Sequence, residues 1–135
     1  MSYKIEEIEG IGPANAKKLG KANIKTTSSL LKLSCTRKGR RDVAEATGVS
    51  EKQLLRWANM ADLMRINGIG QEFSELLEAA GVDTIKELRK RRADNLTKKM
   101  ADVNGKKKLT RRVPAQSMVE DWVAQAKKLK PVISH

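Results

Sequence analysis

The sequence is poor in aromatic residues, cysteine and histidine, and each shortage excludes a class of structure or site. Only Tyr3, Trp57, Phe73 and Trp122 are aromatic, so the core has to be mainly aliphatic. The single cysteine, Cys35, has no partner for an internal disulfide, which predicts a reducing compartment. No cluster of His, Cys, Asp and Glu has the spacing of a metal site, so we expect no metal and no other cofactor.

Long apolar runs and alternating patterns are missing as well. No run is long enough to cross a bilayer, so we expect no membrane partner. No sustained alternation of apolar and polar residues indicates a strand. Hydrophobic residues still make up 39% of the chain, enough for a folded core in a protein of this length. The expectation is a cytoplasmic all-α protein.

Positive charge is the property that the sequence has in excess. The formal net charge is +12 and the isoelectric point is about 10.0, which indicates an acidic partner such as nucleic acid, a ribosome or an anionic surface. Three runs concentrate the charge, at residues 37–41, at residues 89–92, and at Lys106, Lys107, Lys108, Arg111 and Arg112. We expect the third run to be the best contact with a polyanion, because it fills a mobile inserted loop at 105–110.

A short glycine loop occurs twice in the chain. Residues 8–12 read IEGIG, residues 66–70 read INGIG, and the apolar positions that follow each copy align without a gap. A repeat of about 60 residues predicts an internal duplication. The expected units are residues 1–63 and 64–135, packed together as one compact body.

Apolar periodicity and capping signals predict helices in both units. The expected helices cover about 13–22, 27–33, 38–47 and 51–63, then 71–80, a short segment after Thr84, 95–103 and 114–129. Ser50 with Gln53, and Thr84 with Glu87, have the spacing of capping boxes. Gly48 is expected to end the third helix. Trp57 and Trp122 occupy equivalent helices, and we expect both in the core.

The first glycine loop has the composition of a phosphate-binding turn. Its glycines allow positive φ and keep side chains away from the contact surface. The helix that starts at Pro13 leaves backbone amides unpaired and places a partial positive charge there. The candidate contacts in this region are Gly10, Ile11, Gly12, Asn15, Lys17, Lys18 and Lys21.

The second loop differs in its surroundings. Gly68, Ile69 and Gly70 repeat the backbone pattern and are candidate contacts too, but Glu72, Glu75 and Glu78 share one face of the next helix. Three carboxylates oppose a polyanion. We therefore expect the first hairpin to be the better nucleic-acid contact and the second to be structural or to bind a protein. The alternative is that both loops only join packed helices tightly.

Residues 5–19 and 63–77 resemble the helix-hairpin-helix pattern, with Gly10-Ile11-Gly12 and Gly68-Ile69-Gly70 as hairpins. Weaker hairpins are read at 47–50 and 112–114, so the chain resembles two tandem double helix-hairpin-helix (SAM-like) units. It also resembles an uncharacterised bacterial family of this architecture, known only as a domain of unknown function, most distinctively at 50–63 and 119–123. The resemblance implies that a hairpin approaches one DNA strand without reading bases.

The expected function is therefore non-sequence-specific binding of nucleic acid, with DNA favoured over RNA. Two alternatives stay open: a protein-interaction adaptor that uses the acidic helix of the second hairpin, and a ribosome- or RNA-associated factor. No catalytic residue is assigned. The sequence shows no nucleophile with a base and no paired carboxylates, and we expect no enzyme activity.

Overall fold

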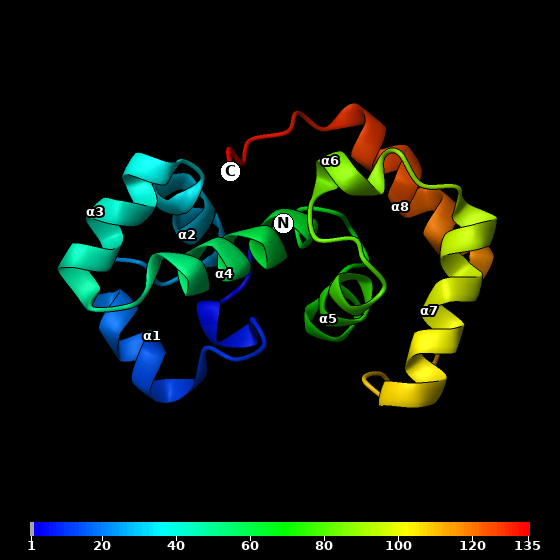
Figure 1. Cartoon of the computed structure of the whole chain (residues 1–135), viewed down its shortest axis with the longest axis horizontal. Coiled ribbons are helices and arrows are strands. Elements are labelled where there is room, and N and C mark those ends of the chain that lie inside the picture. The colour runs from blue at the N-terminus through cyan, green and yellow to red at the C-terminus, as the bar shows by residue number, and fades with distance from the viewer. Residues whose placement is uncertain (1) are drawn as a thin grey trace.

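The computed structural model describes residues 2–135 and is helical in that range. The first half holds α1 (Gly12–Gly20), α2 (Thr27–Ser34), α3 (Arg37–Thr47) and α4 (Glu51–Leu63), preceded by the 3-10 turn η1 (Ile5–Glu7). The second half, on the right of Figure 1, holds α5 (Gln71–Ala79), α6 (Ile85–Leu88), α7 (Ala93–Lys107) and α8 (Gln116–Lys128). The all-α prediction is confirmed. Within residues 2–135, no helix has the length and apolar character that a membrane span needs.

Side-chain caps explain where several helices begin. The hydroxyls of Thr26, Thr36, Ser50 and Thr84 each accept a hydrogen bond from the amide three residues later. Each of the two predicted capping boxes forms only one of its two hydrogen bonds, the one to the cap hydroxyl. Among residues 2–135, the side chains of Gln53 and Glu87 accept no hydrogen bond from the backbone amide of their cap residue. Glu87 pairs with Arg91 instead, at 3.1 Å. Gly48 ends α3 at a φ of +79°, as the sequence predicts.

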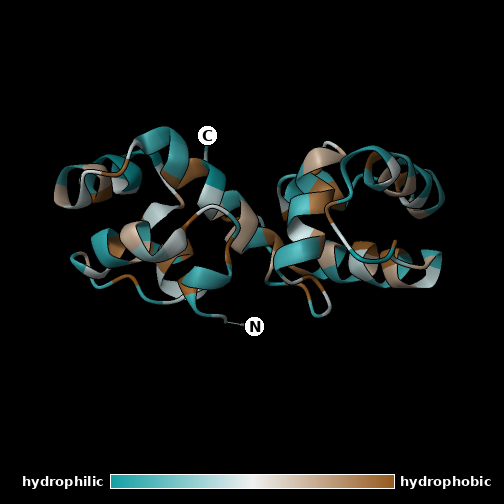
Figure 2. Ribbon diagram, turned by 90° about the horizontal axis from the view of Figure 1, so that it is seen from below, coloured by the Kyte–Doolittle hydropathy of each residue, from teal (hydrophilic) through white to brown (hydrophobic). Residues whose placement is uncertain are grey.

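Each half encloses its own hydrophobic core. The first core gathers around Trp57 and the second around Trp122, and each tryptophan is 1% exposed. Figure 2 shows hydrophobic segments between the helices of both halves and hydrophilic ribbon on their outer sides. The two cores meet at the end of α4, where Leu63 belongs to the second and Met64 to the first. The halves thus share an order of elements, while their origin by duplication stays a prediction.

The last two helices differ from the prediction in their bounds. α7 begins at Ala93 and continues to Lys107, so residues 105–107 are helical and do not belong to an inserted loop. The amide of Lys108 donates to the carbonyl of Asn104 at 2.8 Å and closes this longer helix. α8 begins at Gln116 and not at Pro114. Pro114 is buried in the irregular segment that precedes the helix. The weaker hairpin expected at 112–114 is therefore part of an irregular segment.

Residues 129–135 form a C-terminal strap that returns to the first half (Figure 1, red). The amide of Ser134 donates to the carbonyl of Cys35 at 2.8 Å, and Ile133 packs against the first core. The buried guanidinium of Arg40 donates to the carbonyls of Ser34, at 3.0 Å, and Ser134, at 2.7 Å. The end of the expected second unit thus lies on the first.

Candidate nucleic-acid interface

The first glycine hairpin has the backbone that the sequence predicts. Gly10 has a φ of +91° and Gly12 a φ of +63°. Within residues 2–135, no group accepts a hydrogen bond from the amides of Glu9, Gly10 or Gly12. Ile11 differs from the expected contact, because its side chain is buried and its amide donates to the carbonyl of Ile8. The free amides of this hairpin therefore lie at the glycines and Glu9.

The lysines of α1 are available to a partner. Lys17, Lys18 and Lys21 are exposed, and none of them forms an ion pair within the described chain. Asn15 is half-buried near the start of the helix. These side chains extend the contact surface beyond the hairpin along α1.

Carboxylates nevertheless lie beside the first hairpin. The side chain of Gln71, the first residue of α5, donates to Glu9 at 2.8 Å. Burial raises the pKa of Glu75 on the same helix, and the negative charges of Glu9, Glu78 and Glu72 raise it further against the opposing charge of Arg56. The acidic face of α5 therefore lies near the first hairpin, for which the sequence indicates only lysines as charged neighbours. Its negative charge weakens the attraction of a polyanion to this hairpin.

Arg56 fixes this junction between the two halves. Its guanidinium binds both carboxylate oxygens of Glu78, each at 3.1 Å. The same side chain lies close to Gly10, where an added Cβ would stand 3.3 Å from Nη1. Glu75 and Glu78 are half-buried and only Glu72 is exposed. Much of the acidic face therefore takes part in the contact between the halves, which restricts its use for a protein partner.

The second hairpin is held by α8 and differs in backbone. Gly68 has a φ of +99°, but Gly70 has a φ of −108°, which any residue adopts, so the two copies are not equivalent at their second glycine. The side chain of Gln125 accepts from the amide of Asn67 at 2.9 Å and donates to its carbonyl at 3.2 Å. Ile69 is fully buried. This hairpin serves mainly to connect α5 to α8.

Three of the four cations at residues 37–41 have partners within the chain. Arg37 donates to the carbonyl of His135, and Arg40 donates to Ser34 and to the strap. Lys38 lies 3.9 Å from the carboxylate of Asp42. Burial, and then the charge of Arg37, lower the pKa of Arg40. Arg41 is the one cation of this run without a partner in residues 2–135.

Three of the four cations at residues 89–92 also have partners within the chain. Arg89 donates to the carbonyl of Lys127 at the end of α8, at 3.1 Å. Arg91 donates to Glu87 and to the carbonyl of Gly81, each at 3.1 Å. Arg92 pairs with Asp94 at 3.0 Å. Only the side chain of Lys90 lacks a partner in the part of the chain that is described.

The cations of the third run have no partners in the described part of the chain. We call this run the basic turn, and it comprises Lys106, Lys107, Lys108, Arg111 and Arg112. All five side chains are exposed, and none has a hydrogen-bond or ion-pair partner among residues 2–135. The turn is anchored, contrary to the expected mobile loop, because the side chain of Asn104 holds Thr110 at 2.9 and 3.2 Å. The sequence analysis did not identify Asn104 and Thr110 as anchors of this turn, because apolar periodicity carries no information about such a pair.

The match to a known family covers both hairpins and the basic turn. A family model described as a domain of unknown function (DUF4332) matches residues 9–129. The chain belongs to the DUF4332 family. Neither the curated proteins nor the solved structures compared with it contain a match. Because the match ends at residue 129, most of the C-terminal strap lies outside the range that defines the DUF4332 domain.

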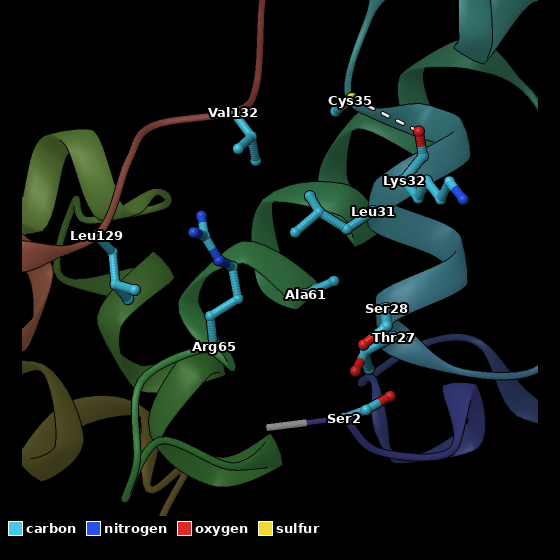
Figure 3. Close-up of a pocket in the computed structure, with 10 residues that line it drawn as sticks. All are labelled: Ser2, Thr27, Ser28, Leu31, Lys32, Cys35, Ala61, Arg65, Leu129 and Val132. Carbon is cyan, nitrogen blue, oxygen red and sulfur yellow. Dashed lines mark hydrogen bonds between the residues drawn. The ribbon is translucent and has the colours of Figure 1, made fainter.

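An apolar groove of about 650 Å³ separates the strap of this DUF4332 protein from α2 and α4. Figure 3 shows Leu31 and Ala61 on one side of it, Leu129 and Val132 on the other, and the guanidinium of Arg65 between them. Its remaining lining residues are Ser2, Thr27, Ser28, Lys32 and Cys35. None of the described residues that line it carries a carboxylate. Elsewhere, the described residues contain no group of three or more His, Cys, Asp or Glu that could hold a metal ion.

Proposed function

We propose that this DUF4332 protein binds nucleic acid through the phosphate backbone and does not read base sequence. The observation that carries the proposal is the basic turn, where five exposed cations have no internal partner within residues 2–135. In each of the other two runs, three of the four cations have a hydrogen-bond or ion-pair partner within the chain. Cations free of carboxylates are the groups that neutralise phosphates and release counterions.

The first hairpin and α1 supply a second contact. The free amides of Gly10 and Gly12 stand at the start of α1, and Lys17, Lys18 and Lys21 add mobile charge. In this reading the two glycine loops are helix-hairpin-helix motifs of duplicated units, and only the first faces a strand. Glu9 and Glu75 make this contact weaker than the basic turn, because they place negative charge beside the amides.

Binding through phosphates has a characteristic dependence on salt. Each phosphate neutralised contributes about 0.9 to the slope of log affinity against log salt on duplex DNA. Contacts to phosphate and sugar position a protein without conveying sequence. The affinity is therefore expected to fall steeply with salt and to change little between DNA sequences.

Titration of a fluorescent random-sequence duplex, followed by anisotropy, tests the proposal. We expect binding at about 50 mM salt that weakens by orders of magnitude toward about 200 mM. An RNA duplex and a single-stranded DNA of the same length run in parallel and identify the class of nucleic acid that binds most tightly. Absence of binding to all three at the lowest salt refutes the proposal.

The apolar groove favours a second candidate, a protein-interaction adaptor. Its surface is mainly apolar, and the guanidinium of Arg65 at its centre is already paired with Asp62 at 2.9 Å, which suits an apolar segment of a partner. Capture from lysate with and without nuclease separates the two functions. A partner that survives nuclease treatment and is lost on Val132→Glu, at a groove residue that is 40% exposed, supports the adaptor, whereas loss of all capture after nuclease supports nucleic acid.

A further inference from the structure

The basic turn is built around the side chain of one buried residue. Asn104, in the last turn of α7, is 9% exposed. Its Oδ1 accepts from the amide of Thr110 at 2.9 Å, and its Nδ2 donates to the carbonyl of the same residue at 3.2 Å. A carboxamide that bonds both backbone groups of one residue fixes the position and the orientation of that peptide.

Thr110 extends the anchor toward the end of the turn. Its hydroxyl donates to the carbonyl of Arg112 at 2.7 Å, and the residue is 8% exposed. On the other side, Lys108 leaves α7 with a φ of +51° while its amide donates to the carbonyl of Asn104 at 2.8 Å. The backbone from Asn104 to Arg112 is thus held at three points, none of which uses a charged side chain.

We propose that Asn104 and Thr110 are positioning residues that hold the basic turn in a conformation ready to receive backbone phosphates. The inference rests on the proposed function and adds the reason why this run, among three, is suited to binding. A flexible loop loses conformational freedom when it binds, whereas an anchored loop has lost that freedom on folding. The anchors therefore raise affinity without touching the nucleic acid.

Variants of Asn104 and Thr110 test the arrangement of the charges in the basic turn without changing their number. Asn104→Ala and Thr110→Val keep all five cations of the basic turn but remove anchoring hydrogen bonds. Thr110→Ser keeps the hydroxyl and is the matched conservative variant. Lys108→Gln removes one charge and leaves the hydrogen bonds of Asn104 and Thr110 in place.

Titration of the same labelled DNA duplex at several salt concentrations tests the inference on these four variants. We expect Asn104→Ala and Thr110→Val to weaken binding roughly three- to tenfold with an unchanged salt slope. Thr110→Ser is expected to bind as the unaltered protein does. Lys108→Gln is expected to lower the slope by about 0.9.

The outcomes distinguish this inference from the proposed function. If the unaltered protein does not bind, both fall. If it binds and the folded Asn104→Ala and Thr110→Val variants bind equally well, the positioning role alone is refuted. Circular dichroism verifies folding, and if Asn104→Ala fails to fold, the comparison of Thr110→Val with Thr110→Ser decides the question.

Discussion

The carboxylate of Asp62, near the end of α4, accepts a hydrogen bond of 2.8 Å from the backbone amide of Ile85, the first residue of α6. Its other oxygen accepts from Arg65 at 2.9 Å, and Arg65 also donates to the carbonyl of Lys130 in the strap. Asp62 is 1% exposed, so these partners replace water. One buried carboxylate therefore connects the first half to α6 and, through Arg65, to the strap.

Removal of this carboxylate is expected to destabilise the whole chain. Asp62→Ala leaves the amide of Ile85 and the guanidinium of Arg65 without their buried acceptor, at a cost of about 3 kcal/mol in unfolding free energy. Asp42→Ala is the control, because that carboxylate forms an exposed ion pair worth under about 1 kcal/mol. Urea denaturation measures both values. Equal losses would contradict the role assigned to Asp62.

Gly68 and Gly70 of the second hairpin are expected to differ in how much stability is lost when each is replaced by alanine. A Cβ on Gly68 would stand 2.9 Å from Nε1 of Trp122, and its φ of +99° is unfavourable for other residues. Gly68→Ala should therefore cost about 2 kcal/mol of stability. Gly70→Ala meets no atom within 4 Å and needs no positive φ, so it should cost far less. Thermal unfolding of the two variants provides the comparison, and similar losses would refute it.

The strap is expected to open more readily when its contact with Arg40 is lost. Arg40→Gln removes the guanidinium that holds the carbonyl of Ser134, and a hydrogen bond from a charged group contributes about 1.5 kcal/mol or more. The amide of Ser134, which donates to the carbonyl of Cys35, should then exchange with deuterium about tenfold faster. Arg41→Gln, which removes an exposed arginine of the same run, should leave this exchange rate unchanged. An unchanged rate in Arg40→Gln would show that Arg40 does not hold the strap.

Glu75 is expected to make stability fall with rising pH. Burial, with the charges of Glu9, Glu78 and Glu72, raises its pKa in the folded protein above the ordinary 4.5 of a glutamate. Between those two pKa values the folded state holds more protons than the unfolded state, so the free energy of unfolding decreases as pH rises. Glu75→Gln should flatten this dependence and stabilise the protein at pH 7. Urea titrations at several pH values detect the change, and an identical pH profile in the variant would exclude it.

Local signals in the sequence predicted much of the fold. Apolar spacing and capping hydroxyls such as Ser50 act within a few residues of one another, and the structure confirms the helices they indicate. The burial of Trp57 and Trp122 follows from the same periodicity. The end of α7 was missed because it depends on Asn104 and Thr110, whose pairing bridges a break in the helical pattern.

The candidate site was less predictable, because its character depends on distant contacts. Glu9 and Gln71 are 62 residues apart, and their hydrogen bond brings an acidic helix to the first hairpin. Arg40 and Ser134 are 94 residues apart, and their contact uses a cation that the sequence presents as available. A run of arginines looks the same in a sequence whether its side chains bind carbonyls or face water.

The most direct test of nucleic-acid binding compares two variants of equal charge. One replaces the five cations of the basic turn by glutamine. The other replaces five exposed lysines outside the basic turn and α1, Lys52, Lys86, Lys90, Lys98 and Lys128. Each lowers the formal charge of +12 by five.

The measurement is the salt dependence of binding to a random-sequence DNA duplex by both variants and the unaltered protein. We expect the basic-turn variant to lose about 0.9 of slope for each phosphate contact removed, together with most of the affinity, while the other variant keeps most of both. Equal losses in the two variants would mean that net charge alone attracts the DNA, and would contradict a specific role for the basic turn.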